Sequence, residues 1–157
     1  MRKKGISKMS SSCRRRSLGF TLLEVLITVV IVGILAAIAL PSYEYFVTRS
    51  RIVEATTALG DMRSQMEKFF MDNRTYDSAG KCAIDAAMTT YNANTANKFA
   101  LTCAGDAVSY VITATGGGPM SSFAYTINQQ NVKTTTGTKW GKTSGNCWVT
   151  RDDGSCL

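Results

Sequence analysis

Residues 19–25 read Gly-Phe-Thr-Leu-Leu-Glu-Val, and they join a basic leader to an apolar stretch of 21 residues that runs from Phe20 to Leu40. Glu24 is the only ionisable side chain in that stretch. As a helix, a segment of this length spans roughly 30 Å, which is the thickness of the hydrocarbon core of a bilayer. A carboxylate inside such a segment is costly unless a partner meets it, so Glu24 marks a functional site.

The positive charge of the chain is concentrated at its N-terminus. The first nineteen residues contain seven Lys and Arg and no Asp or Glu, which accounts for the whole formal net charge of +7. From Phe20 onward, eleven Lys and Arg face eleven Asp and Glu. The leader therefore indicates a cytoplasmic flank of a membrane segment, and net charge gives no reason to expect nucleic-acid binding by the remainder.

The apolar stretch continues into an amphipathic pattern. Pro41 follows it directly, and a proline inside a helix removes one hydrogen bond and tends to kink the helix. Apolar and small residues then recur at steps of three and four, at Tyr45, Thr48, Ile52, Ala55, Leu59, Met62, Met66 and Phe69. The pattern predicts one long helix from about residue 20 to about residue 71, bent near Pro41, whose second half packs on a sheet. A free coiled coil is the alternative.

The C-terminal half carries strand signals. Residues 75–97 are rich in small polar residues and predict a loop, with one short helical turn near 84–88. Strands are expected at 98–103, 108–115, 123–127 and 132–136, and a weaker one at 147–150. Short turns between them, at 116–119 and 128–131, favour an antiparallel meander. The predicted fold class is α+β, with the long N-terminal helix packed on an antiparallel β-sheet head.

Five cysteines divide between the leader, which holds Cys13, and the C-terminal half, which holds Cys82, Cys103, Cys147 and Cys156. Four cysteines in an exported domain predict two disulfides, for which three connectivities are possible. The pairs Cys82–Cys103 and Cys147–Cys156 are favoured because each closes a short loop. A zinc site is the competing interpretation, but the sequence has no histidine and no C-x-x-C pair. We expect no metal, no cofactor and no catalysis.

The segment 19–25, the basic leader before it, the unbroken apolar run after it and Pro41 together resemble the N-terminal signature of type IV pilins and the related pseudopilins. The resemblance covers roughly residues 13–45. It is specific, because the leader, the glycine, the phenylalanine that follows it and the glutamate four residues later all coincide. It also implies the pilin fold.

This resemblance implies how the chain is processed and assembled. In the family, a membrane prepilin peptidase cuts after the glycine on the cytoplasmic side and the new N-terminal phenylalanine is methylated, which here places the cut between Gly19 and Phe20. The freed ammonium and Glu24 would lie one helical turn apart. Each charge is costly alone and is compensated by a neighbouring subunit only in the correct register. Phe20, Glu24 and Pro41 are therefore the expected assembly residues.

Two alternatives concern the same segment. Ala37-Ile38-Ala39 has the form that ordinary signal peptidase accepts, and cleavage there would release a protein beginning at Leu40. An unpaired Glu24 could also snorkel toward the headgroups instead of pairing with a neighbour. The expected organisation is a leader at 1–19, a membrane or filament-core helix at 20–40, its amphipathic continuation at 41–72 and a head at 73–157.

The end of the chain, residues 145–149 followed by 152–156, resembles the PilE-type pilins of type IVa pili. The loop between its two cysteines holds only eight residues, which favours a minor pilin. The main prediction is a structural subunit of a type IV pilus (fimbrium), with roles such as twitching motility or cell adhesion. It is single-pass in the inner membrane before assembly and lies on the cell surface afterwards. Its expected partners are other pilins, the prepilin peptidase and methyltransferase, and the assembly platform, with no specific nucleic acid.

Two other classes stay open: a type II secretion pseudopilin, and a minor or tip pilin that captures DNA or a surface. For the second, aromatic and basic residues near the last cysteine pair could contact the ligand, namely Lys139, Trp140, Lys142, Trp148 and Arg151. The simpler interpretation places one tryptophan in the core and the other at its rim.

Overall fold

The computed structural model describes residues 19–156, and only the backbone at position 41. The predicted leader at 1–19, with Cys13, lies outside the described residues except for Gly19. The chain forms two compact units, one ending at Leu40 and one beginning at Pro41. Each unit is described by itself.

A single helix, α1, spans Leu22–Asn73 and contributes to both units. It begins after Thr21, whose Oγ1 accepts a hydrogen bond from the backbone N–H of Glu24 at 3.2 Å, as an N-cap residue does. It ends where Arg74 adopts a positive φ of 59° while its N–H still donates to the carbonyl of Phe70. The predicted long helix is thus confirmed within two residues at each end, whereas the bend near Pro41 stays a prediction.

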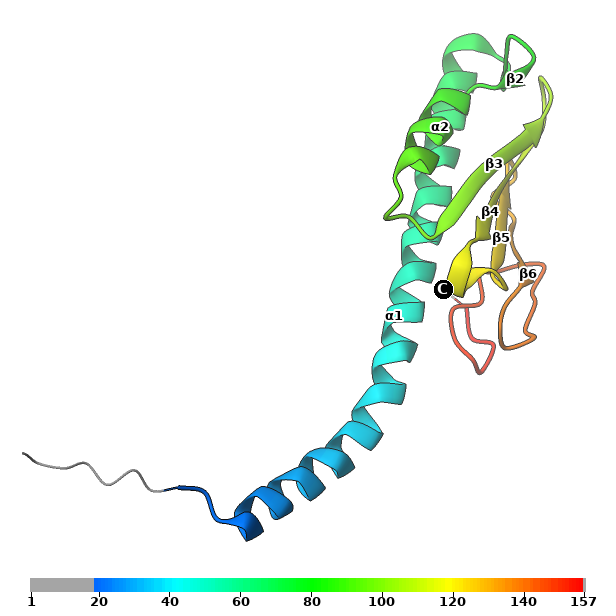
Figure 1. Ribbon diagram of the computed structural model, residues 1–157. Coiled ribbons are helices and arrows are strands. Elements are labelled where there is room, and N and C mark those ends of the chain that lie inside the picture. Colours follow the sequence, from blue (N-terminus) through cyan, green and yellow to red (C-terminus); the bar gives the residue numbers. More distant parts are fainter. Residues whose placement is uncertain (1–18, 157) are drawn as a thin grey trace, which may run out of the picture. The chain divides into compact units, whose positions relative to one another are not determined.

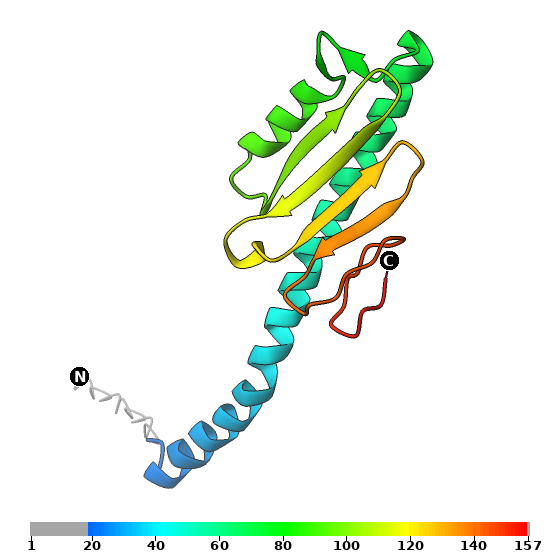
Figure 2. The same ribbon diagram turned by 90° about the vertical axis from the view of Figure 1, so that its right-hand side faces the viewer.

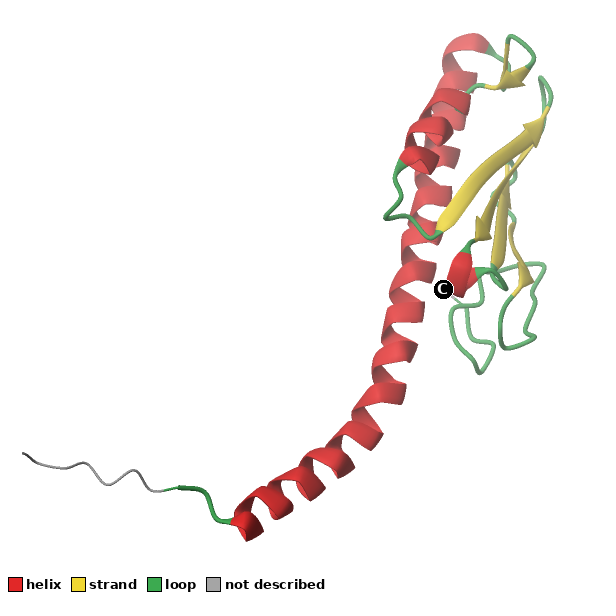
Figure 3. Ribbon diagram, viewed as in Figure 1, coloured by secondary structure: helices red, strands yellow, loops and turns green. Residues whose placement is uncertain are grey.

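The second unit contains a four-stranded sheet. Its strands are β3 (Phe99–Gly105), β4 (Tyr110–Gly116), β5 (Ala124–Asn128) and β6 (Lys133–Gly137). They are hydrogen-bonded in the order β3-β4-β5-β6, and each neighbouring pair is antiparallel. Figures 2 and 3 show this meander lying against the part of α1 that belongs to the same unit. The predicted α+β class and meander are confirmed.

The core lies between α1 and one face of the sheet. The predicted helix stripe contributes five buried side chains, Ile52, Ala55, Leu59, Met62 and Met66. The sheet contributes the alternating residues of β4 and β5, namely Tyr110, Ile112, Ala114, Tyr125 and Ile127, together with Phe123 just before β5. The strand predicted at 108–115 begins two residues later than expected, and Val108 is 74% exposed because it lies in the turn that precedes β4.

Two segments between α1 and the sheet are more ordered than the sequence predicts. The expected loop contains a small hairpin of β1 (Asp77–Ser78) and β2 (Lys81–Cys82). The expected single turn is a helix of nine residues, α2 (Asp85–Ala93), which lies beside β3 (Figure 1). A short 3-10 helix, η1 (Gly118–Met120), follows β4 where a turn was predicted.

The weak strand predicted at 147–150 is wrong. In the structure this segment has only an isolated bridge, between Val149 and Cys156. Its polar backbone groups bond to side chains instead. The hydroxyl of Thr135 donates to the carbonyl of Cys147 and accepts from the N–H of Val149, and the hydroxyl of Tyr125 donates to the carbonyl of Val149. Side chains of β5 and β6 therefore hold this segment against the sheet.

Candidate functional site

The first unit presents an apolar helix surface that nothing in the described chain covers. Phe20 is 77% exposed, and almost every large apolar side chain between Leu22 and Leu40 is exposed. Among residues 19–156, α1 is the helix long and apolar enough to cross a membrane. An apolar surface of this extent must be buried by lipid or by other protein surfaces.

The expected processing and assembly residues lie at the start of this unit. Gly19 and Phe20 precede α1, and Glu24 lies in its first turn with an exposed side chain. The Glu24 carboxylate makes no ion pair with any residue in the described part of the chain. Its N-terminal position in the helix favours the negative charge. The roles of these residues stay predictions.

The structure contains the two cysteine pairs that were favoured because each closes a short loop. Cys82 of β2 is joined to Cys103 of β3, which ties the β1–β2 hairpin to the edge of the sheet. Cys147 and Cys156 are joined as well and close the loop at the end of the chain. Among residues 19–156, no group of His, Cys, Asp or Glu is arranged to hold a metal ion.

Positive charge gathers in the C-terminal part of the head. Between Asp106 and Asp152 the sequence contains four Lys and Arg and no acid. Three of these cations, Lys139, Lys142 and Arg151, are exposed. Lys133, Lys139 and Lys142 therefore have no acid within nine residues in the sequence, whereas Arg151 is followed directly by Asp152 and Asp153.

The turn that carries Lys142 is held in a fixed conformation. Thr138 is buried, and its hydroxyl donates to the carbonyl of Lys142 at 2.8 Å and accepts from the Lys142 N–H at 3.0 Å. Gly141, within the turn, adopts a positive φ of 69°, which few other residues tolerate. The stem of Lys142 passes the C-terminal loop, since a Cβ placed on Gly154 would lie 3.7 Å from its Cδ. The 138–142 turn and the 147–156 loop therefore lie side by side where the Lys142 stem passes Gly154.

The two tryptophans follow the simpler of the two interpretations. Trp148 is buried and its Nε1 donates to the carbonyl of Thr126. Trp140 is half-buried and packs edge-to-face on Phe123, with ring centroids 5.2 Å apart. The buried ring of Trp148 is not available to a ligand, whereas Trp140 remains partly exposed. The ligand-contact hypothesis therefore stays a prediction for Trp140 and for the cations.

The sequence reasoning missed Lys133. Its Nζ lies 4.7 Å from the centre of the Trp148 ring, so this lysine covers the tryptophan as a cation–π partner. The gap in acidic residues between 106 and 152 could have drawn attention to it.

Comparisons with known proteins agree with the geometry of both units. Residues 14–40 match the prokaryotic N-terminal methylation motif. Residues 41–138, more than half of the chain, match the family described as "Type IV minor pilin ComP, DNA uptake sequence receptor".

Several curated fimbrial proteins are similar to part of the chain. The fimbrial protein EcpC of Eikenella corrodens is 38% identical over 97 residues, which are 62% of this chain and 61% of that protein. The type IV major fimbrial protein FimA of Dichelobacter nodosus is 42% identical over 66 residues, 42% of this chain and 40% of FimA. A probable minor fimbrial protein of the same organism is 42% identical over 57 residues, 36% of each chain.

These matches span between about a third and three fifths of the length of the relatives. The family consists of structural pilin subunits rather than enzymes, and the resemblance drawn from residues 13–45 is confirmed. The chain therefore belongs to the type IV pilins, within the ComP family of minor pilins.

Proposed function

We propose that this chain is a minor subunit of a type IV pilus that captures DNA at its head. The observation that carries the proposal is the stretch between Asp106 and Asp152, which contains four cations and no acid, in a head that matches the family of a DNA uptake sequence receptor. In this proposal the chain sits in the inner membrane before assembly and on the cell surface afterwards.

Assembly uses the first unit. The prepilin peptidase cuts between Gly19 and Phe20 and the same enzyme methylates the new amine. The assembly platform then transfers the helix from the bilayer to the filament core. Exposed apolar side chains throughout residues 22–40 support such a transfer, because lipid and neighbouring helices bury them equally well. Glu24 pairs with the N-terminal ammonium of an adjacent subunit and so selects one axial register.

DNA capture uses the exposed cations of the head. Lys139 and Lys142 belong to the turn after β6, and Arg151 belongs to the closing loop that the Lys142 stem passes, so these two neighbouring loops offer three exposed charges to phosphates. The mature chain is close to neutral, which led the sequence reasoning to expect no specific nucleic acid. Local charge decides phosphate contact, however, because surface charges more than a Debye length apart are screened.

The assembly step is tested by replacing Glu24 with Ala in the producing cell. We expect the variant to be missing from sheared pili while it remains in the membrane fraction, as measured by quantitative mass spectrometry of both. Asp61→Ala is the matched control, because Asp61 is an exposed acid on the same helix and should not change incorporation. Normal incorporation of Glu24→Ala would refute the register role.

The capture step is tested with Lys142→Ala and Arg151→Ala on assembled pili. Each contacted phosphate contributes about −0.9 to the slope of log affinity against log salt, so three contacts predict a slope near −3 and each variant reduces it by about 1. Lys81→Ala is the control, since Lys81 pairs with Asp85 at 3.3 Å on another part of the head. If binding and slope stay unchanged in both variants, the chain is a structural pilin whose head does not capture DNA through these cations.

A further inference from the structure

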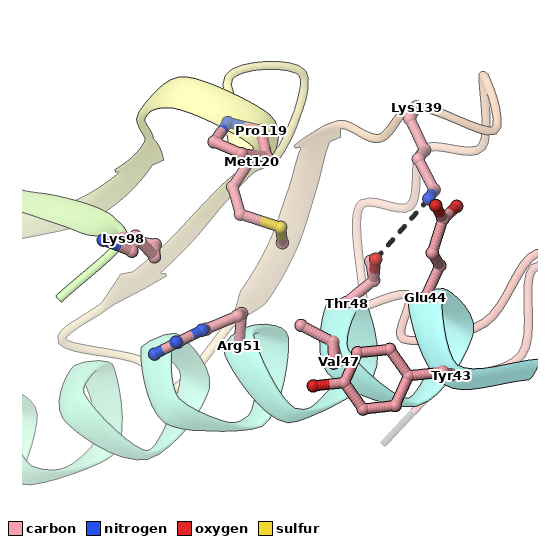
Figure 4. Close-up of a pocket in the computed structure, with 9 residues that line it drawn as sticks. All are labelled: Tyr43, Glu44, Val47, Thr48, Arg51, Lys98, Pro119, Met120 and Lys139. Carbon is pink, nitrogen blue, oxygen red and sulfur yellow. Dashed lines mark hydrogen bonds between the residues drawn. The ribbon is translucent and has the colours of Figure 1, made fainter. Parts of the chain in front are cut away.

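A groove of about 440 Å³ lies in the second unit where the first turns of its helix meet three loops of the head. The helix residues come from positions 43–51, and the loop residues precede β3, form η1 and follow β6 (Figure 4). None of the assembly or DNA-capture steps accounts for this groove. Lys139 lines it and is also one of the three cations proposed to contact DNA.

Cations predominate in the wall of the groove. Arg51, Lys98 and Lys139 line it, and Glu44 is its only acid among the described residues. Arg51 pairs with an acid outside the groove, at 3.2 Å. Lys98 and Lys139 make long hydrogen bonds, 3.4 Å to a backbone carbonyl and 3.5 Å to the hydroxyl of Thr48, and the Lys139 Nζ also lies 6.0 Å from the centre of the Trp140 ring. Neither lysine makes an ion pair within the described residues. Two ammonium groups are therefore available to an anion that enters.

The rest of the groove is apolar. Val47, Pro119 and Met120 line it, and Tyr43 lies at its edge with 68% of its surface exposed (Figure 4). Phe46, one position before Val47, is 64% exposed. Exposed aromatic rings next to cations are typical of segments that lie at the interface between a membrane and water.

Chain connectivity places this groove near the bilayer. Tyr43 follows Leu40, the end of the apolar stretch, by three residues, and three residues reach at most about 11 Å in any conformation. The headgroup layer extends roughly 5 to 8 Å beyond the hydrocarbon core on each side. Along α1, which continues through these positions, three residues rise only about 4.5 Å, so an occupant at the Tyr43 end of the groove is within reach of the lipid headgroups.

We propose that the groove binds the headgroup of an anionic phospholipid, with its phosphate at Lys139 and its glycerol region against Tyr43 and Val47, while Lys98 lines the opposite side of the groove (Figure 4). The partner is the leaflet on the head side of the membrane that holds residues 20–40, so the inference rests on the proposed membrane stage. Binding holds the head against the bilayer until the subunit is extracted into the filament.

The test uses the full-length chain in vesicles of phosphatidylcholine, with or without phosphatidylglycerol. Vesicles are first washed at alkaline pH to show that the chain is inserted. Lysine acetylation, read by mass spectrometry, then reports the accessibility of each amine. We expect Lys98 and Lys139 to become protected as phosphatidylglycerol is added, while Lys68 and Lys142, both exposed and outside the groove, stay reactive.

Variants distinguish binding of a headgroup in the groove from non-specific electrostatic attraction between the head and the anionic membrane. A lysine near an anionic membrane contributes about fivefold to affinity. In Lys139→Ala the phosphatidylglycerol fraction that half-protects Lys98 should therefore rise about fivefold. Lys81→Ala, the control, should leave that fraction unchanged.

Three outcomes would overturn the inference in distinct ways. Equal footprints in both kinds of vesicle, or equal protection of Lys142, would show that the groove takes no headgroup. Protection of Lys98 by duplex DNA but not by phosphatidylglycerol would assign the groove to nucleic acid. Loss of the chain from the washed vesicles would instead refute the membrane stage of the proposed function, and this inference with it.

Discussion

Replacing Thr135 with Val should destabilise the head although the two side chains have nearly the same shape. Thr135 lies in β6 with 1% of its surface exposed. Its hydroxyl donates to the carbonyl of Cys147 at 2.9 Å and accepts from the N–H of Val149 at 2.8 Å. This one oxygen is therefore the main link between the sheet and the start of the C-terminal loop.

The valine variant keeps the methyl group and leaves two buried backbone groups without partners. A buried group without its hydrogen bond costs about 1 to 3 kcal/mol, so the pair should cost about 2 to 6 kcal/mol of unfolding free energy. For a unit of this size, that corresponds to a fall in Tm of roughly 8 to 24 °C. Thr135→Ser keeps the hydroxyl and loses one methyl group, which costs only about 1 kcal/mol.

Tryptophan fluorescence of the full chain in detergent measures the effect, because both tryptophans lie in the head. Urea unfolding of the wild type and the two variants gives the free energies directly. We expect the valine variant to be clearly less stable than the serine variant. A valine variant more stable than the serine variant would show that the methyl group contributes more than the hydroxyl, and a valine variant as stable as the wild type would refute the bonding role of Thr135.

Three further predictions concern the head. Replacing Cys82 and Cys103 by Ser opens a crosslink with a sequence separation of 21, and the chain-entropy relation predicts a loss of about 3 kcal/mol in urea unfolding. Burial, and then a hydrogen bond to a carboxylate, raise the pKa of the Tyr110 hydroxyl. The folded state thus holds this proton more tightly than the unfolded chain, so stability should be constant below about pH 10 and fall above it, with a smaller fall in Tyr110→Phe. Asn92→Ala should cost about 2 kcal/mol and speed hydrogen exchange at Leu101, because the Asn92 amide both donates to the Leu101 carbonyl and accepts from its N–H at 2.8 Å; unchanged exchange at Leu101 would contradict this.

The elements predicted well from sequence are those whose local pattern matches their burial. Tyr110 and Ile112 alternate along β4, and Ile52 and Leu59 share one face of α1, so period two and period 3.6 suffice. The helix α2 shows no such pattern: Thr and Asn residues weaken it, and Met88 is its one buried side chain within Asp85–Ala93. Its stability comes from packing on the sheet, which a local pattern does not contain.

The wrong strand at 147–150 has a related cause. Trp148 and Val149 are buried and apolar, which imitates a strand in a sequence. What distinguishes the segment is where its backbone groups bond, and their partners are the hydroxyls of Tyr125 and Thr135, more than ten residues away. When a side-chain hydroxyl, rather than a neighbouring strand, satisfies the backbone hydrogen bonds, the sequence shows no periodic pattern that identifies it.

The candidate sites divide in the same way. Gly19, Phe20 and Glu24 lie within six consecutive residues, so a linear sequence motif describes them. Lys142 and Arg151 are also close in sequence. The groove is different, because Lys98, before β3, meets residues of α1 some fifty positions earlier only through the fold. Predicting it requires the packing of the head.

Net charge is a poor guide to what the head binds, and the arrangement of its acids explains why. Three acids form ion pairs with cations within four residues: Glu54 and Glu67 on α1, and Asp85 at the start of α2. Within each pair the two charges cancel, so these residues add nothing to the net charge. The cations after Asp106 have no such partners in sequence until Asp152. A neutral total with segregated charge attracts an anion at close range while adding little long-range steering, so capture of DNA by this head should depend strongly on salt and weakly on the overall charge of the subunit.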